Sequence, residues 1–195
     1  MITHLLIIFC ASILTNNIAL TYFLGMCPFI AISKDLRTAF GMGIAVTFVM
    51  TLTATINWCL YEYILVPNGV EYLAYVTFIL VIAALVQIVE MIIERFSSFL
   101  YVSMGIFLPL ITVNCAILGV SLFMVIRNYS FFEVVAYSLG SGLGWMLAIL
   151  AMAGIRSKLR FADVPRGLEG AGITLIIAGI MALGFMGFAG IISLQ

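Results

Sequence analysis

The chain has 195 residues, of which 65% are hydrophobic and only 8% are charged, and its formal net charge is zero. Soluble domains carry about 25% charged residues, so this composition excludes a soluble fold, and without a basic surplus no nucleic-acid partner is expected. The apolar start has no positively charged n-region and is too long for an h-region, so it predicts a membrane span and no signal peptide. We expect one all-α integral membrane domain over residues 1–195, embedded in a lipid bilayer.

Six apolar stretches are each long enough to cross about 30 Å of hydrocarbon as a helix. In chain order they cover residues 3–32, 39–61, 71–93, 101–126, 132–154 and 171–193. The first is longer than a straight span needs, and a break near Gly25 and Pro28 would absorb the excess. A second break is expected near Pro109. Breaks at membrane depth persist only where the freed backbone groups are satisfied inside the protein.

The loops between these spans carry charge asymmetrically. The loops after the first, third and fifth spans hold seven of the eight basic residues, and the opposite loops hold only Arg127. The positive-inside rule makes the basic side cytoplasmic. Both termini are therefore expected to face outward.

The two halves of the chain match at an offset of 97 residues, with repeat 1 at about 1–97 and repeat 2 at about 98–195. Three spans is an odd number, so the second half enters the membrane from the opposite face, as an inverted repeat. Such folds hold their sites near the midplane, on broken helices. The cysteines do not follow the repeat. The matched positions are Thr15 and Thr112, Asn17 and Asn114, Ala19 and Ala116, Gly43 and Gly140, Ala54 and Ala151, Thr77 and Thr174, and Ile79 and Ile176.

Two of the four cysteines, Cys27 and Cys115, lie beside the expected breaks. Two thiolates are half of the set that an iron–sulfur cluster usually takes, so this interpretation requires a partner chain. Ordinary packing, a disulfide and a zinc site are the alternatives, although zinc usually recruits histidine and the single histidine, His4, stands at the outer end of the first span. Cys10 and Cys59 lack a neighbouring break and are expected to pack as small apolar side chains.

Polar and backbone groups near the two thiols are candidates for contacts to sulfur. Asn17 and Asn114 are predicted to donate either to sulfur or to carbonyls freed at the breaks, and the alternative is hydrogen bonding between helices. Gly25, Pro28 and Thr112 complete these surroundings.

Two further polar residues lie toward the inner end of the third span. Gln87 and Glu90 share a helix face, and an ionisable group at membrane depth is a candidate for ion coupling. The alternative for Glu90 is a boundary charge paired with Arg95 or an inner-loop base. The small residues Gly140–Gly144 predict close helix packing, which we expect against a partner chain. No dinucleotide fingerprint or Walker A motif occurs, so no flavin or nucleotide is expected on this chain.

Five stretches of the chain carry the motifs of a known family: Leu24–Phe29, Gly105–Ala116, Gly144–Ile149, Ala153–Arg156 and Met181–Met186. They resemble the RnfA/NqrE family, and the resemblance covers nearly the whole chain. The resemblance implies a six-helix subunit of the Rnf or Na⁺-translocating NADH:quinone reductase complexes of bacterial inner membranes, with periplasmic termini. It also implies a homologous RnfE/NqrD-like partner of opposite topology, with which Cys27 and Cys115 hold one [2Fe-2S] cluster inside the membrane.

The function implied by this resemblance is electron transfer within a redox-driven, ion-translocating oxidoreductase, together with the other subunits of the complex. Tyr63–Pro67 resembles RnfA, whereas Arg127–Arg156 resembles NqrE, so the electron donor, the acceptor and the coupling ion stay open. An alternative is a secondary transporter, or an ion-path subunit without a redox centre, because inverted repeats with broken helices also build transporters.

Overall fold

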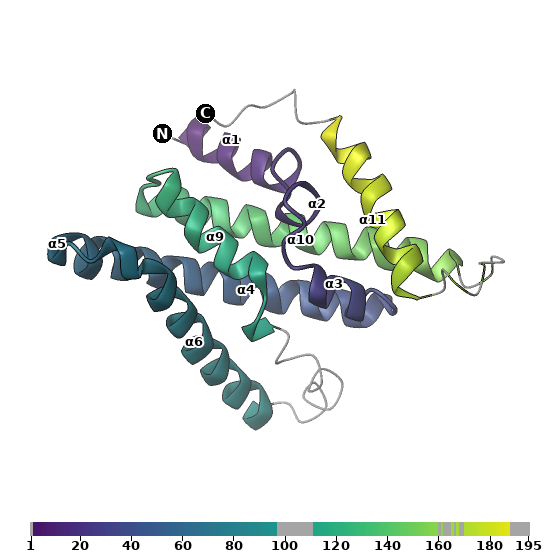
Figure 1. Ribbon diagram of the computed structural model, residues 1–195, viewed down its shortest axis with the longest axis horizontal. Helices are drawn as coiled ribbons and strands as arrows, with labels where there is room; N and C mark the ends of the chain where they lie inside the picture. Colours follow the sequence, from purple (N-terminus) through teal and green to yellow (C-terminus); the bar gives the residue numbers. More distant parts are fainter. Residues whose placement is uncertain are drawn as a thin grey trace.

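The computed structural model describes residues 2–96, 111–159, 161, 165, 167 and 170–187. Within these ranges all regular structure is helical, which confirms the predicted all-α class. The expected break near Pro109 lies outside the described residues. In chain order (Figure 1) the elements are α1 (Ile2–Ile13), α2 (Ile18–Thr21), α3 (Met26–Ile32), α4 (Leu36–Leu60), η1 (Tyr61–Leu65), α5 (Val66–Asn68), η2 (Glu71–Leu73), α6 (Ala74–Phe96), α9 (Cys115–Ile126), α10 (Phe131–Leu159) and α11 (Ala171–Met186).

Each predicted apolar segment contains a described helix, although several helices run beyond the predicted bounds. Among the described residues, three helical stretches are long and apolar enough to cross a membrane: Leu36–Asn68, Glu71–Ile92 and Phe131–Leu159. Three shorter apolar helices occupy the first, fourth and sixth segments: Thr3–Ile13, Cys115–Ile126 and Ala171–Met186. The first segment is broken as expected, and it breaks twice, between α1 and α2 and again between α2 and α3.

The second span runs further than its predicted end at residue 61. Helix α4 continues through the π-helical turn η1 into α5, where Pro67 lies in the first turn. Proline is tolerated there because the first turn of a helix needs no backbone donor from it. The helix ends at Gly69, which adopts a left-handed conformation with φ +67°, a common helix terminator.

Helices α4 and α10 form the centre of the fold and run antiparallel (Figure 1). Small residues let them approach closely: a Cβ on Gly142 would lie 2.8 Å from the Cα atom of Thr47. On the same helix, a Cβ on Gly144 would lie 3.0 Å from the carbonyl oxygen of Ile13 in α1. The glycine-rich face of Gly140–Gly144 therefore packs within this chain, and the expectation that it faces a partner is wrong.

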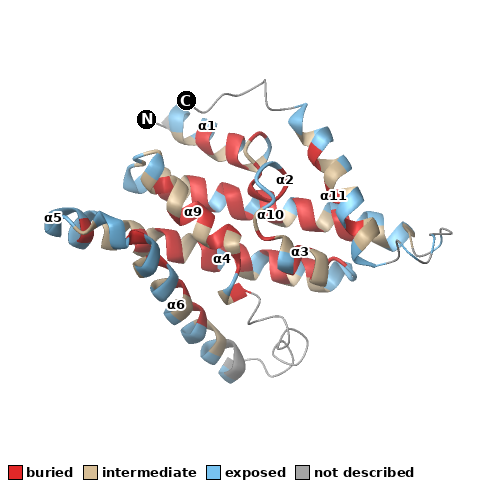
Figure 2. Ribbon diagram, in the orientation of Figure 1, coloured by how far each residue is buried: buried red, intermediate tan, exposed pale blue. Residues whose placement is uncertain are grey.

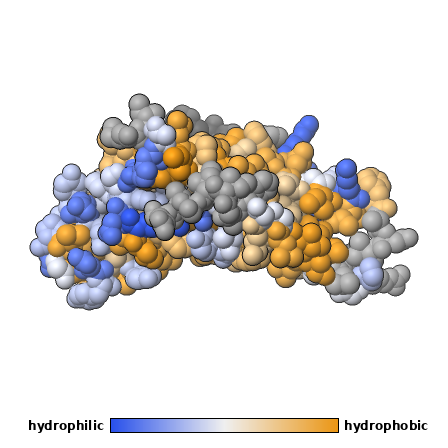
Figure 3. Space-filling view, turned by 90° about the horizontal axis from the view of Figure 1, so that it is seen from above, coloured by the Kyte–Doolittle hydropathy of each residue, from blue (hydrophilic) through white to orange (hydrophobic). Residues whose placement is uncertain are grey.

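Burial is concentrated on this centre, while α6 and α11 present largely exposed faces (Figure 2). Leu80 on α6 is 66% exposed, and Leu183 on α11 is 70% exposed. Hydrophobic side chains cover broad areas of the surface (Figure 3). Such a surface suits lipid or neighbouring apolar subunits, since soluble monomers rarely expose large continuous apolar patches.

Polar contacts tie the helices together at both ends of the bundle. At one end, His4 Nδ1 of α1 lies 3.1 Å from Glu133 Oε1 of α10. At the other end, Arg156 Nη1 donates to the carbonyl oxygen of Ile30 at 2.8 Å and to Ser33 Oγ at 2.7 Å. The first pair falls on the predicted outer side of the membrane and the second on the predicted inner side.

Several local features recur at the 97-residue offset. Asn17 caps α2 and Asn114 caps α9, and each side chain accepts from the backbone N–H two residues later. Helices α6 and α11 begin at Ala74 and Ala171, which are equivalent positions. The halves differ at the cysteines, because α9 runs unbroken where repeat 1 divides into α2 and α3.

Candidate metal centre at two helix breaks

The first break is organised by Asn17, which is fully buried. Its Oδ1 accepts from the backbone N–H of Ala19 at 3.1 Å. Its Nδ2 donates to the carbonyl oxygens of Ile13 at 3.1 Å and Gly144 at 2.7 Å. Asn17 therefore donates to one carbonyl at the end of α1, as predicted for a break. Its bond to Gly144 joins two helices, which was the alternative role for this residue. It also anchors the broken segment to α10.

The next break depends on left-handed backbone at Phe23 (φ +54°) and Gly25 (φ +78°). Left-handed backbone is unfavourable for residues with a Cβ, so glycine suits the second position. Cys27 and Pro28 then lie in the first turn of α3, where proline is tolerated. Pro28 is buried, whereas Cys27 is exposed on the surface of the chain.

The third break precedes α9 and resembles the first. Asn114 has extended backbone angles (φ −75°, ψ 108°), and its Oδ1 accepts from the backbone N–H of Ala116 at 3.0 Å. Cys115 is the first residue of α9 and is half-buried. Thr112 is also half-buried and lies in the short helical turn just before this break.

One hydrogen bond joins the last two breaks. The backbone N–H of Gly25 donates to Cys115 Sγ at 2.9 Å, between residues 90 positions apart in the chain. Cys27 follows only two residues after this donor. The fold therefore brings the segments of Cys27 and Cys115 together, as an arrangement of two thiols around one centre requires. Cys10 on α1 and Cys59 on α4 belong to neither of these breaks.

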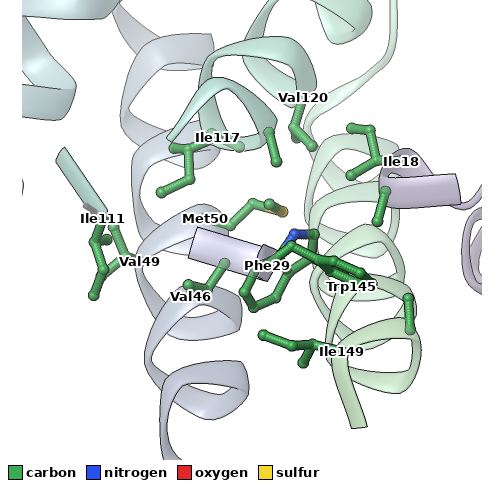
Figure 4. Close-up of a cluster of buried hydrophobic side chains, with 14 of the residues drawn as sticks. Ile18, Phe29, Val46, Val49, Met50, Ile111, Ile117, Val120, Trp145 and Ile149 are labelled. Carbon is green, nitrogen blue, oxygen red and sulfur yellow. The ribbon is translucent and has the colours of Figure 1, made fainter. Parts of the chain in front are cut away.

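Trp145 of α10 packs against the site, and the sequence alone did not indicate a role for it there. A Cβ on Gly25 would lie 2.7 Å from Trp145 Nε1, 2.9 Å from Asn114 Oδ1 and 3.0 Å from the Cβ of Ala116. Trp145 is fully buried and meets Phe29 of α3 edge-to-face, with ring centroids 6.5 Å apart (Figure 4). The sequence did contain one signal for this contact: Trp145 directly follows the glycine-rich face of α10, and such a face permits close approach of other segments.

The donors around this site suit an anionic group bound through sulfur. In the described part of the chain no three His, Cys, Asp or Glu residues gather as a metal site, so this chain offers two thiols rather than a complete ligand set. The Gly25 N–H already points at one sulfur. Asn114 Nδ2 and Trp145 Nε1 are buried without a described hydrogen-bond partner. Hydrogen bonds to sulfur are a main way in which proteins stabilise iron–sulfur clusters, so these residues fit half of such a site.

Glu90 and Gln87 lie on α6 and belong to neither break. Gln87 is exposed and Glu90 is half-buried. Among the described residues Glu90 forms no ion pair, so Arg95 is not the partner that was considered for it.

The chain matches the family model described as "Rnf-Nqr subunit, membrane protein" over residues 5–192. The chain belongs to this family. Relatives from Serratia proteamaculans and Aeromonas salmonicida, each named as a subunit of the Na(+)-translocating NADH-quinone reductase, are 56% and 55% identical to it. Each alignment covers 96% of this chain and 98% of the relative. The protein of the same name from Glaesserella parasuis is 56% identical over the same shares.

The Rnf-Nqr match confirms the family expected from the five sequence stretches. It extends over nearly the whole chain, and so over all the breaks described above.

Proposed function

We propose that this chain is the NqrE-type member of a Na⁺-translocating NADH–quinone reductase and carries electrons through the membrane. The names of relatives at 52–56% identity support the Nqr complex over the Rnf complex. In this proposal Cys27 and Cys115 are two of the four ligands of a [2Fe-2S] cluster. The observation that carries it is the hydrogen bond from Gly25 to Cys115 Sγ, which joins the two cysteine-bearing breaks.

A bound [2Fe-2S] cluster supplies a one-electron redox centre inside the membrane. Cys27, exposed on the surface of the chain, presents its thiolate to a group shared with a second chain. Gly25 donates to the Cys115 sulfur and so offsets negative charge that would be costly in a medium of low polarity. Asn17 and Asn114 hold the broken backbone in place through their caps.

The remaining two thiolates come from a homologous NqrD-like subunit of opposite topology. Two observations support a partner: the ligand set on this chain is half complete, and large apolar faces of α6 and α11 stay exposed. We also propose that the chain is an inverted repeat. The matching asparagine caps and the equivalent starts of α6 and α11 support this arrangement.

Orientation gives a direct prediction. Because seven of the eight basic residues fall in loops on one side, both termini should face the periplasm of the bacterial inner membrane. Alkaline phosphatase fused after Gln195 is therefore expected to be active, and a green fluorescent protein fused at the same point is expected to be dark. The opposite pair of signals would overturn the orientation.

Glu90→Gln is expected to leave the cluster intact, because Glu90 lies on α6 and outside both breaks. Its half-buried position at the inner end of a membrane span makes it the candidate coupling group of this chain. Sodium uptake and NADH oxidation would be measured together in vesicles. Glu71→Gln is the control for lost charge, because it removes an exposed carboxylate just before the other end of α6. Lost sodium uptake with retained electron transfer assigns coupling to Glu90, whereas two normal rates leave it a boundary charge.

The alternative is a transporter or ion-path subunit without a redox centre, which the recurring helix breaks also suit. The two functions are distinguished by measuring iron and acid-labile sulfide in the complex purified after co-expression of all subunits. If the proposal holds, a complex in which both Cys27 and Cys115 are replaced contains one cluster fewer than the unmodified complex. Equal iron and sulfide in the two complexes would favour the ion-path function.

A further inference from the structure

Two buried hydrogen-bond donors beside the cysteine breaks lack an acceptor among the described residues. They are the indole Nε1 of Trp145 and the side-chain Nδ2 of Asn114. Trp145 is fully buried, and Asn114 is 2% exposed. A buried donor without an acceptor destabilises the fold, so two of them in one place indicate that an acceptor joins them in the assembled protein.

The indole of Trp145 lies against the backbone that joins the two cysteine segments. A Cβ on Gly25 would lie 2.7 Å from Trp145 Nε1 and 2.9 Å from Asn114 Oδ1, which already accepts from the N–H of Ala116. The N–H of the same glycine donates to Cys115 Sγ. Two donors, the N–H of Gly25 and the indole N–H of Trp145, therefore lie beside the segment that contacts Cys115. Figure 4 shows the Trp145 indole in the buried cluster beside Phe29 and Met50.

The packing of Trp145 explains why this donor is held in place. Its ring meets Phe29 of α3 edge-to-face, and the preceding residue, Gly144, accepts the hydrogen bond from Asn17. The indole is thus fixed by segments on both sides of the broken span. Because the indole is already held in place, its N–H loses little conformational entropy when it forms a hydrogen bond to an acceptor.

We propose that the indole N–H of Trp145 donates a hydrogen bond to sulfur of the group held by Cys27 and Cys115, and thereby raises its reduction potential. The inference rests on the proposed function. Reduction adds one negative charge to an iron–sulfur group, and a donor to sulfur stabilises that charge more than it stabilises the oxidised form. The effect is large where the surroundings are dry, because charges there are poorly screened. Trp145 is a positioning and tuning residue that supplies no ligand.

Trp145→Phe is the test, because phenylalanine keeps an aromatic ring against Phe29 and removes only the donor and part of the ring. The assembled complex is titrated with a reductant, and the cluster signal is followed by electron paramagnetic resonance. The expected result is a lower midpoint potential than in the unmodified complex. Trp58→Phe is the matched control, since Trp58 Nε1 already donates to the carbonyl oxygen of Tyr129 at 2.9 Å. The midpoint potential of the cluster should be the same in this variant as in the unmodified complex.

A second measurement keeps the inference testable if Trp145→Phe fails to load the cluster. In the unmodified complex grown with ¹⁵N-indole tryptophan, pulsed resonance of the reduced cluster should detect a ¹⁵N coupling. An absent coupling, or an unchanged potential in a loaded Trp145→Phe complex, overturns the inference while leaving the cluster assignment intact. A complex whose iron does not depend on Cys27 and Cys115 overturns the proposed function instead.

Discussion

Complexes carrying Cys27→Ala or Cys115→Ala are each expected to contain about two iron atoms and two sulfides fewer than the unmodified complex. In the proposed cluster site, each change would remove one of the two thiolate ligands that this chain contributes, and with it one negative charge. Quinone reduction by NADH should fall to background in both. Iron, acid-labile sulfide and the resonance signal of the reduced cluster would be measured on the purified complex.

Cys10→Ala and Cys59→Ala are the matched controls. Cys10 lies on α1 and Cys59 near the end of α4, and neither adjoins a break that holds a candidate ligand. Both controls should keep the full iron content. A cluster signal that survives replacement of Cys27 and Cys115 together would return both residues to ordinary packing.

Gly25→Ala is expected to be almost as damaging, although it touches no ligand. A left-handed backbone costs a residue with a Cβ roughly 1–2 kcal/mol, and the new Cβ would lie only 2.7 Å from Trp145 Nε1. Relief of that overlap would move the break, and with it the N–H that donates to Cys115. We expect a complex that assembles but has lost most of its cluster.

Gly69→Ala separates the two causes. Gly69 has a similar φ of +67°, but nothing lies within 4 Å of the position its Cβ would take. The Gly69→Ala substitution should lower the free energy of unfolding by about 1 kcal/mol. It should leave the iron content, the sulfide content and electron transfer unchanged. If Gly25→Ala behaved in the same way as Gly69→Ala, the close packing at Gly25 would not matter for the centre.

The parts of the fold that depend on local composition were predictable. Each of the six apolar segments contains a described helix, and three of these helices are long and apolar enough to cross a bilayer. The break beside Pro28 was expected from the neighbouring glycine, and Gly25 does adopt a left-handed conformation. Asn17 and Asn114 were identified as polar residues of interest, and they act as helix caps.

The parts of the fold that depend on contacts between distant segments could not be predicted from the sequence. The additional break before Asn17 needs a carbonyl acceptor on Gly144, 127 residues away. In the sequence Trp145 is indistinguishable from an ordinary core residue, and only the fold shows that it packs against Gly25. The continuation of α4 past residue 61 also escaped prediction, because the π-helical turn Tyr61–Leu65 carries the helix on into α5, with Pro67 in its first turn.

The bond between Gly25 and Cys115 also bears on how the protein is made. It joins residues 90 positions apart, so a nascent chain with only its first three segments in the membrane holds Cys27 without the partner that the finished fold brings to it. The two cysteine-bearing segments meet only after the segment that contains Cys115 has been made and has packed against Gly25. In the proposed function, the cluster would therefore be loaded late in biogenesis, after translation has passed the middle of the chain.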